Sequence, residues 1–454
     1  MPFETERASY APLRRILQSE TVRRLQKRFR LAKTGEAEQE PLLVSESLPD
    51  ANRPFPDMIL AVDGSYHVTP VKNGYPGAEI GYITIAAVLI LLDKLHKIAT
   101  DDIINPVEYR QTQKRSSIDT ALPGRGVIID DERTPEASMR KTLFEGMAEY
   151  RVFPDSESIL ETYEALMNRA PDDRPLNCPC EDKNHPYRRL CGSYKCKRCG
   201  CALYSTDAMR LHELFSPHES GEKMYGHVMS TLERLWLVHV LRAFERREKE
   251  RSGEEWLAVI GRMAFILDGP LAVYGTPAWL STPIREELAR INATQKVVTN
   301  TDMMILGVEK SGAFARHFEM LDTREEGRQP RFSAGQYLLL TNDYIRSHIV
   351  PSDEQRQYGR NTYFGRKLLH KTVLGHRLVV NVACFTEEQR DLSSARPEQF
   401  PRLADALALF DKISSNLYPN SISPLIAAHS EAAIPLNLGS SILESIARKA
   451  VSDV

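Results

Sequence analysis

Two carboxylates in this sequence follow an apolar run and precede a glycine, an arrangement typical of a side chain at the end of a buried strand. Asp63 closes the run 58–62 and is followed by Gly-Ser, and Asp268 closes the run 263–267 and is followed by Gly-Pro. Open α/β sheets place their sites just beyond strand ends. Two carboxylates brought together there repel each other unless a cation holds them, and their hard oxygen atoms suit Mg²⁺ or Mn²⁺. The pattern predicts a divalent-cation site, although Asp-Gly also simply makes turns.

A third carboxylate is expected on a helix packed against these strands. Glu233 lies in Leu-Glu-Arg-Leu-Trp, a charge beside the apolar stripe of a long helix over 224–250. Glu213 and Glu245 are its rivals, and a glutamate in this setting is also typical of a solvated helix face. Two such ions about 4 Å apart can activate a water and stabilise the leaving oxygen of a phosphodiester.

Two basic side chains could serve the same chemistry. Lys310 ends the apolar run 303–309, where it could neutralise a scissile phosphate or form an ordinary surface ion pair. His429 lies in the apolar segment 424–431, where a catalytic role competes with that of a hydrogen-bonded core histidine.

A basic segment with interleaved aromatic residues covers 363–371. Its cations are Arg366, Lys367 and Lys371. Such a segment suits phosphate contact and base stacking, and it equally suits an exposed hairpin. We expect these three side chains to contact DNA if the protein acts on it.

Six of the seven cysteines lie between 178 and 201, with the spacing C-x-C-x10-C-x4-C-x2-C-x-C. One tight cluster indicates a metal site rather than a disulfide framework, and the knuckle 196–200 is typical of tetrahedral zinc. We expect a structural zinc held by Cys178, Cys180, Cys196 and Cys199. Cys191, Cys201 and His185 compete for the four positions, and Cys384 is expected to be a buried apolar filler.

Composition limits the class of protein. The 454 residues carry 59 Lys and Arg against 61 Asp and Glu, and 42% are hydrophobic, values close to those of globular proteins. No apolar run reaches the roughly 20 residues that span a bilayer, and the N-terminal segment lacks the apolar core of a signal peptide. We therefore expect a cytoplasmic protein without a membrane contact.

Strands that alternate with helices after an early antiparallel pair predict a mixed-sheet α/β fold. The first strands are expected over 58–65 and 78–92, and a helix is expected over 337–349. We divide the chain into four segments. They are a basic N-terminal helix and linker (1–56), the first part of a core (57–175), a zinc-ribbon insertion (176–206), and the second part of the core with C-terminal helices (207–454).

Taken in order, these motifs resemble the NurA nuclease domain. The resemblance covers roughly residues 57 to 435 and consists of strand-Asp-Gly-Ser, helix-Glu, Leu-Asp-Gly-Pro-Leu, Gly-Val-x-Lys, Tyr-x-Gly-Arg-Lys and a late Leu-x-x-Ala-His. It implies a ribonuclease H-like mixed sheet flanked by helices. Members of that family are Mn²⁺- or Mg²⁺-dependent DNA nucleases, form dimers, and work with the hexameric HerA helicase or translocase in DNA end processing. Bacterial relatives also occur in anti-phage defence.

The resemblance also implies a role for single residues. Asp63 matches the first metal-binding aspartate, Asp268 the second, and Glu233 the helix carboxylate between them. Lys310 matches the lysine after the next strand, and His429 the late histidine. The sequence departs from the family at two places: the cysteine module interrupts the core before the Glu helix, and the Tyr-Pro pair expected before Ala-His stands further upstream, at 418–419.

We therefore expect a metal-dependent deoxyribonuclease that forms a homodimer and caps a HerA-type hexameric ATPase, in DNA repair or in antiviral defence. The zinc ribbon would be structural, or would dock DNA or the ATPase. The rival hypothesis is a catalytically silent ribonuclease H-like adaptor that binds DNA and a ring-shaped partner. Asp63 and Asp268 argue against the adaptor, because a silent copy is free to lose either one.

Overall fold

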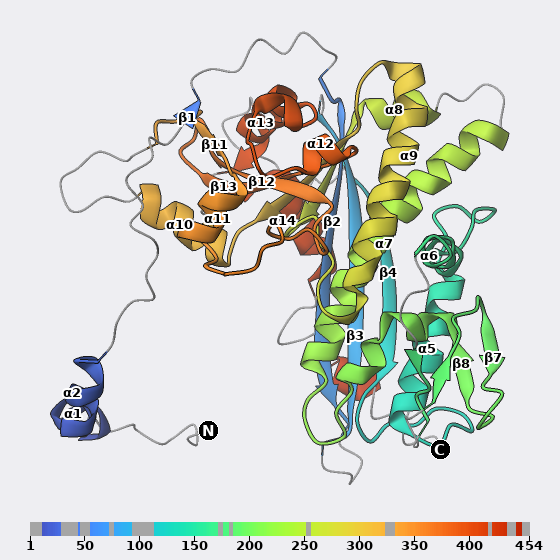
Figure 1. Cartoon of the computed structure of the whole chain (residues 1–454). Helices are drawn as coiled ribbons and strands as arrows, with labels where there is room; N and C mark the ends of the chain where they lie inside the picture. Colours follow the sequence, from blue (N-terminus) through green and yellow to red (C-terminus); the bar gives the residue numbers. More distant parts are fainter. Residues whose placement is uncertain are drawn as a thin grey trace.

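The fold is that of a computed structural model (Figure 1). It describes residues 11–28, 44–45, 55–71, 77–92, 113–170, 176–180, 185–250, 256–322, 332–415, 420–433 and 442–446. Within these ranges, no helix combines the length and the apolar character that a membrane crossing requires. The predicted segment 1–56 lies largely outside them; its described part includes two short helices, α1 (Ala11–Gln18) and α2 (Glu20–Gln26).

A nine-stranded mixed sheet forms the centre of the protein, in the order β1-β11-β12-β13-β10-β9-β2-β3-β4. Its strands are β1 (Val44–Ser45), β2 (Met58–Pro70), β3 (Glu79–Leu91), β4 (Gln113–Pro123), β9 (Met263–Asp268), β10 (Met304–Glu309), β11 (Tyr337–Leu339), β12 (Gly365–Lys371) and β13 (Arg377–Ala383). β2, β3 and β4 form an antiparallel meander, and β9 and β10 join β2 in parallel. Counted along the chain, these five strands lie in the order 3-2-1-4-5, which confirms the predicted ribonuclease H-like sheet.

β2 is longer than its sequence predicted, and this sets the position of the site. We expected the strand to end in a turn at Gly64-Ser65, but β2 pairs with β3 through Pro70. Its pairing with β9 stops at Val62, opposite Leu267. The Asp-Gly-Ser motif therefore lies where a neighbouring strand ends rather than where its own strand ends.

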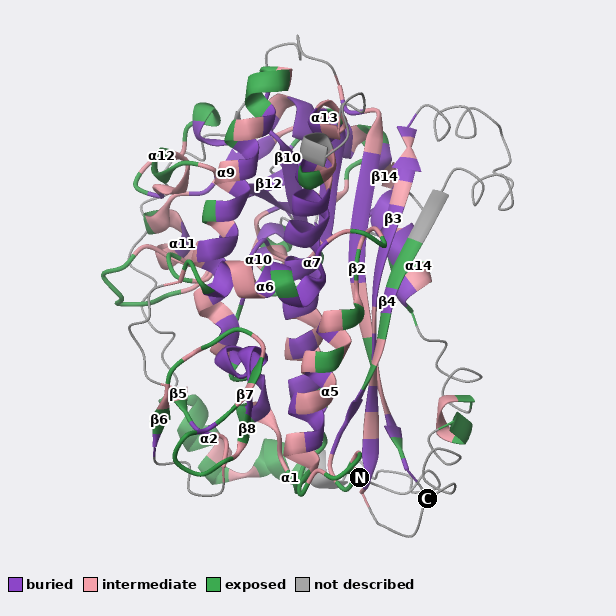
Figure 2. Ribbon diagram, turned by 90° about the vertical axis from the view of Figure 1, so that its right-hand side faces the viewer, coloured by how far each residue is buried: buried purple, intermediate pink, exposed green. Residues whose placement is uncertain are grey.

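Helices cover both faces of the sheet (Figures 1 and 2). One face carries α5 (Pro135–Glu149), α6 (Ile159–Met167), α7 (Glu222–Glu250), α8 (Trp256–Gly261) and α9 (Ser281–Thr299). Near β11–β13 the same face carries α10 (Ala313–Asp322) and α11 (Asn342–His348). The opposite face carries α13 (Leu403–Ile413) and α14 (Ser423–Ala432). Two apolar cores result, one on each side of the sheet.

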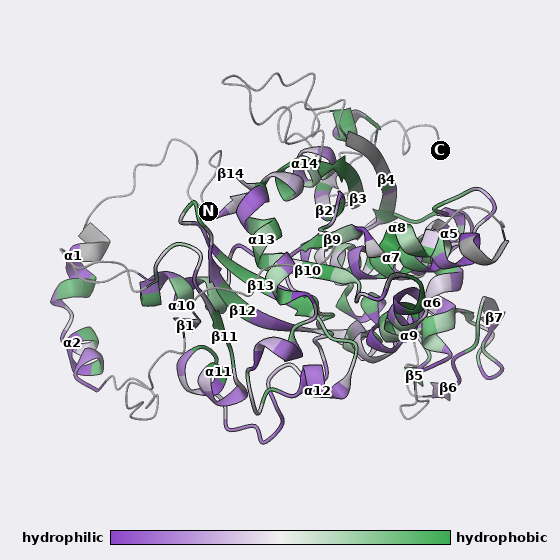
Figure 3. Ribbon diagram, turned by 90° about the horizontal axis from the view of Figure 1, so that it is seen from above, coloured by the Kyte–Doolittle hydropathy of each residue, from purple (hydrophilic) through white to green (hydrophobic). Residues whose placement is uncertain are grey.

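The apolar alternation along the central strands explains the two cores. Leu60 and Val62 of β2 pack on the α7 face, while Ile59 and Ala61 pack on the α14 face. β9 and β10 follow the same rule and are buried on both sides. Figure 3 accordingly shows β9, β10 and β13 in the colour of hydrophobic residues.

One further difference from the sequence prediction concerns a short segment. Residues 337–349 form strand β11 and helix α11, because Thr341 caps the helix and so ends the extended segment before it. The cysteine segment forms two hairpins, β5 (Leu176–Asn177) with β6 (Pro186–Tyr187) and β7 (Ser193–Lys195) with β8 (Ala202–Tyr204). The boundaries of the four predicted segments stay a prediction.

Candidate active site

Asp63 and Asp268 lie on adjacent parallel strands, one residue beyond the last paired positions of β2 and β9. Both alternate with Val62 and Leu267, which face α7, so both carboxylates point toward the α14 face. Asp63 is 4% exposed, and Asp268 is half-buried. The structure thus brings together the two carboxylates that the sequence singled out.

Each of these carboxylates contacts a basic side chain from a distant part of the chain. His429 Nδ1, on α14, lies 2.9 Å from Asp63 Oδ2, and Lys310 Nζ, just after β10, lies 3.0 Å from Asp268 Oδ2. Burial raises the pKa of Asp63 above its ordinary value and the nearby Asp268 raises it further, while His429 and Lys310 oppose the rise. The net effect of these groups is a raised pKa of Asp63.

Glu233 reaches the same strand from the other face of the sheet. A Cβ atom placed on Gly64 would lie only 2.6 Å from Glu233 Oε1. The backbone N–H of Gly64 in turn donates to Asp63 Oδ1 at 2.9 Å. The glycine of Asp-Gly-Ser is therefore required by the close approach of a helix carboxylate, not by a turn.

Arg234 is a site residue that sequence reasoning missed. Its guanidinium is buried, pairs with Glu233, and donates from Nη2 to the carbonyl oxygens of Asp268 at 3.4 Å and Pro270 at 3.2 Å. Burial lowers the pKa of Arg234 to about 10, against the raising effect of nearby groups that include Asp268. The sequence pattern that could have revealed Arg234 is the Glu-Arg pair at 233–234, which interrupts an apolar helix face.

The donor set suits a hard divalent cation. Asp63 and Asp268 offer adjacent carboxylate oxygens whose mutual repulsion an ion would relieve. Within the described ranges, Asp63, Glu233 and Asp268 do not all come within 4.8 Å of one another. Glu233 is instead held by its ion pair with Arg234.

The other two helix carboxylates have different partners. Glu213 pairs with Arg210 at 2.7 Å on the surface, and Glu245 pairs with Arg290 at 2.6 Å at the far end of α7. Among the three candidates, Glu233 is the one that the structure places beside the Asp-Gly motif. Tyr418 lies outside the described residues.

The expectation that the basic segment faces DNA is wrong in this structure. Arg366, Lys367 and Lys371 are all buried, because β12 lies inside the sheet and is covered on both faces. Lys367 Nζ lies 2.8 Å from Glu309, Lys371 Nζ lies 2.9 Å from Asp322, and Arg366 donates to backbone carbonyls. These cations satisfy internal partners and do not offer a phosphate-binding surface.

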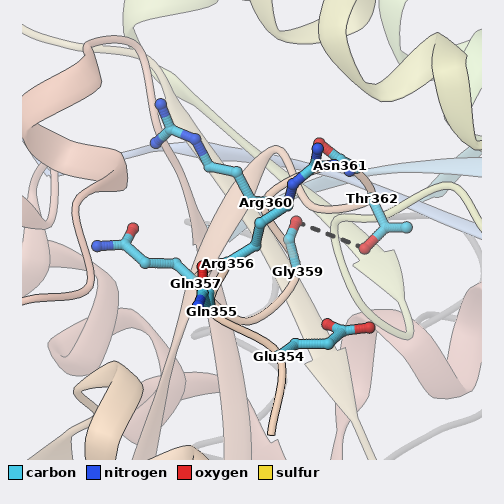
Figure 4. Close-up of a pocket in the computed structure, with 8 residues that line it drawn as sticks. All are labelled: Glu354, Gln355, Arg356, Gln357, Gly359, Arg360, Asn361 and Thr362. Carbon is cyan, nitrogen blue, oxygen red and sulfur yellow. Dashed lines mark hydrogen bonds between the residues drawn. The ribbon is translucent and has the colours of Figure 1, made fainter.

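A hollow opens beside the loop that leads into β12 (Figure 4). This loop lies against the segment that follows Asp268, since Val273 N donates to Thr362 O at 2.9 Å. Polar side chains dominate its lining, but none of the predicted catalytic residues belongs to it. It is lined by Glu354, Gln355, Arg356, Gln357, Gly359, Arg360, Asn361 and Thr362.

Four metal-ligating side chains meet in the cysteine module: Cys178, His185, Cys196 and Cys199. Their ligand atoms all lie within 4.8 Å of one another, with 3.6 Å between the sulfurs of Cys178 and Cys199 and 3.3 Å between His185 Nε2 and Cys196 Sγ. Zn–S bonds of about 2.3 Å give tetrahedron edges of about 3.8 Å, close to these separations. Hydrogen bonds from the backbone of Cys199 and Arg198 lower the pKa of Cys196 to about 6, which favours the thiolate. The cluster can hold zinc.

This set differs from the predicted ligands in one member, since His185 takes the place of Cys180. The β5–β6 hairpin puts His185 opposite Cys178, whose N–H donates to the carbonyl of His185 at 3.0 Å. Cys180 Sγ stays 4.0 Å from His185 Nε2, outside the group of four. Cys191 is exposed, and Cys384 is buried as expected.

Comparison with known proteins finds one family. A family model described as the NurA domain matches residues 57–251, a stretch that includes Asp63, Glu233 and the cysteine module. A structural comparison finds the NurA nuclease from Sulfolobus solfataricus, at 11% identity and TM-score 0.30, covering 98% of this chain and 97% of that one. A second crystal structure of NurA matches at 12% identity and TM-score 0.28, covering 87% and 88%. No curated protein matches this chain.

Proposed function

We propose, from the premise that this chain is a NurA-domain protein, that it is a nuclease that hydrolyses DNA with the help of Mn²⁺ or Mg²⁺. One observation carries the proposal. Asp63, Asp268, Lys310 and His429, spread over 366 positions of the chain, meet at the point where β9 stops pairing with β2. Carboxylates that can hold a metal ion, with basic groups beside them, can support metal-assisted phosphodiester hydrolysis.

In this proposal Asp63 and Asp268 hold the cation, and Glu233 joins them from α7. A divalent ion bound there would supply water activation and charge neutralisation at the phosphate. Lys310 Nζ, which lies 3.0 Å from Asp268 Oδ2, would stabilise the negative charge of a non-bridging phosphate oxygen. The carboxylate of Asp63 orients the ring of His429 through Nδ1, and this leaves Nε2 to exchange a proton with water or with the leaving oxygen.

The test is cleavage by the purified protein. Linear duplex and single-stranded DNA are incubated with MnCl₂, MgCl₂ or EDTA, and products are resolved on a denaturing gel. Asp63→Asn and Asp268→Asn should each lose at least 100-fold in rate, because each removes a ligand charge. Asp343→Asn, an exposed aspartate on α11, is the matched control and should cleave like wild type.

A second candidate function has its own supporting observation. Both strand-end carboxylates already contact a basic group, and Glu233 is held by Arg234, as in a site that no longer needs an ion. The rival is therefore a catalytically silent adaptor that binds DNA. Wild-type protein that binds DNA but cleaves none with any of the metals would favour the adaptor over the nuclease.

The proposal extends to partners. We place the protein in the cytoplasm as a homodimer that works with a HerA-type hexameric ATPase in DNA end processing or anti-phage defence. The premise of a NurA domain supports this assembly.

A further inference from the structure

We propose that the cysteine module carries a phosphate-binding surface that docks nucleic acid away from the strand-end carboxylates. We call it the ribbon surface and define it by Lys195 at the end of β7 and by Lys197 and Arg198 on the knuckle 196–200. The inference deepens the proposed function, because it takes DNA as the ligand. It assigns to the module a role that a purely structural zinc site would not need.

The charge of the module is the first observation. Residues 176–206 contain six Lys or Arg against two Asp or Glu, an excess of four positive charges in a chain whose net charge is −2. Three thiolates and a neutral imidazole around Zn²⁺ would remove only one of them. The rest of the chain is therefore net negative and repels a polyanion, while the module attracts it.

The second observation is how these cations are displayed. Lys195, Lys197 and Arg198 are all exposed, and the described residues of the module, 176–180 and 185–204, include no Asp or Glu. Figure 2 shows the β5–β8 hairpins largely in the colour of exposed residues, at one corner of the molecule.

The third observation is that the module is fixed to the body of the protein. Arg140 of α5 forms a buried ion pair with Asp207 and also donates to the carbonyl of Ala202 at 2.7 Å. Tyr163 OH of α6 donates to Ser205 O at 2.9 Å. A fixed platform loses little conformational entropy when it binds a phosphate backbone, so the ribbon surface acts as a preformed contact.

This placement also answers a difficulty in the proposed function. The three cations expected to meet DNA on β12 are buried in internal ion pairs and backbone hydrogen bonds. The protein then needs another positive surface to hold a duplex at physiological salt. The ribbon surface supplies one from a different part of the chain.

The experiment compares two triple variants with the same change in net charge. One combines Lys195→Glu, Lys197→Glu and Arg198→Glu. The control reverses three exposed arginines elsewhere: Arg133→Glu, Arg316→Glu and Arg356→Glu. Both are made in an Asp63→Asn background to prevent cleavage, and both are checked for one zinc per chain by elemental analysis.

Fluorescence anisotropy then gives the Kd for a labelled duplex between about 50 and 200 mM KCl. The ribbon variant should bind DNA at least about 10-fold more weakly. The steepness of the plot of log K against log salt should decrease by about 3, since each of three lost phosphate contacts contributes about 0.9. The control should stay within about 2-fold of the background protein with an unchanged slope. Equal effects of the two triples, or none from the ribbon triple, would overturn the proposal.

The outcome separates this inference from the proposed function. If the ribbon triple has normal DNA affinity and wild-type protein cleaves DNA, the ribbon-surface proposal is rejected. The nuclease hypothesis is then still supported. If wild-type protein cleaves no DNA and only the ribbon triple binds DNA weakly, the nuclease hypothesis is rejected. The ribbon surface is then still supported as a DNA-binding surface.

Discussion

Gly64 is the residue at which the site leaves the least room. A methyl group there would lie 2.6 Å from Glu233 Oε1 and 2.8 Å from the Cγ atom of Met229. Gly64→Ala should therefore push α7 away from β2, cost about 1–3 kcal/mol of unfolding free energy, and raise the Mn²⁺ concentration needed for half-maximal cleavage. Gly226→Ala is the control, because its nearest contact would be an ordinary 3.4 Å. A Gly64→Ala protein with wild-type metal dependence would show that Glu233 does not act at the site.

Arg234 is the side chain that ties the helix carboxylate to the strand end. It pairs with Glu233 and donates to the carbonyls of Asp268 and Pro270. Arg234→Gln should weaken Mn²⁺ binding, measured by calorimetry, by about 10-fold or more, since a buried polar contact of about 1.5–3 kcal/mol is lost. Arg234→Lys should recover part of it.

A control for Arg234 lies further along the same helix. Arg242 is also buried and paired, but with Glu157 and Glu287, away from the site. Arg242→Gln should lower the melting temperature and leave the Mn²⁺ affinity unchanged. Equal loss of Mn²⁺ affinity in both variants would reduce Arg234 to a general stabiliser of α7.

Single residues differ in how far the sequence could place them. Asp63 and Asp268 could be paired in advance because each follows an apolar run, and two parallel strands bring these positions side by side even though β2 continues to Pro70. The burial of Lys367 could not be predicted, because its partner Glu309 lies 58 positions away and no local pattern connects the two residues. Gly64 and Arg234 were missed for a similar reason: their importance comes from an approach across the sheet edge that only tertiary packing creates.

The zinc knuckle gives a prediction at the scale of elements. Because the β5–β6 hairpin places His185 rather than Cys180 in the cluster, His185→Ala should lose zinc and Cys180→Ser should keep it. Elemental analysis of the two proteins, purified without chelator, decides between them. The double change Cys196→Ser and Cys199→Ser should also lose zinc and lower the melting temperature, with the central sheet still folded by circular dichroism. Zinc retained in His185→Ala would return Cys180 to the ligand set.

The packing of α6 on α7 predicts a dependence of stability on pH. His239 is buried beside Thr162, 2.8 Å from its hydroxyl, and burial lowers the pKa of His239 to about 4. As the pH falls from 6.5 toward 4, His239 binds a proton in the unfolded chain but not in the folded chain. The free energy of unfolding therefore decreases across this pH range. Between pH 7 and pH 5 wild type should lose about 2 kcal/mol more unfolding free energy than His239→Gln.

Urea unfolding of both proteins at the two pH values tests this difference. His317 also has a pKa lowered by burial to about 4, but it is present in both proteins and cancels in the comparison. Parallel loss of stability in wild type and His239→Gln would contradict the prediction.

Elements were predictable where periodicity is strong and unpredictable where tertiary pairing decides. The long strand β3 and the helix α7 lie close to their expected bounds. The extension of β2 to Pro70 depends on β3 as a partner, which the sequence of β2 alone does not contain. The division of 337–349 into β11 and α11 depends on the single N-cap at Thr341. The helix predicted over the whole segment gave no sign of this cap.

The whole molecule carries one prediction about assembly. If the match to the NurA-domain model over residues 57–251 extends to assembly, this near-neutral chain should form a homodimer and join a hexameric ATPase, which would add to the attraction that the ribbon surface exerts on DNA. Light scattering of the purified protein, alone and mixed with a HerA-type ATPase encoded beside it, measures both masses. If the protein is a monomer in both samples and the ATPase does not affect cleavage, both the homodimer and the complex with the ATPase are contradicted.

The separation of Asp63 from His429 by 366 positions has a consequence for synthesis. A growing chain can form the β2–β3–β4 meander and the cysteine module early, but β2 gains its parallel neighbour only after Met263 to Asp268 emerge. Asp63 gains His429 only after α14 leaves the ribosome. A nascent chain that has not yet released α14 therefore carries no complete site, and under the proposed function it would not yet cleave DNA.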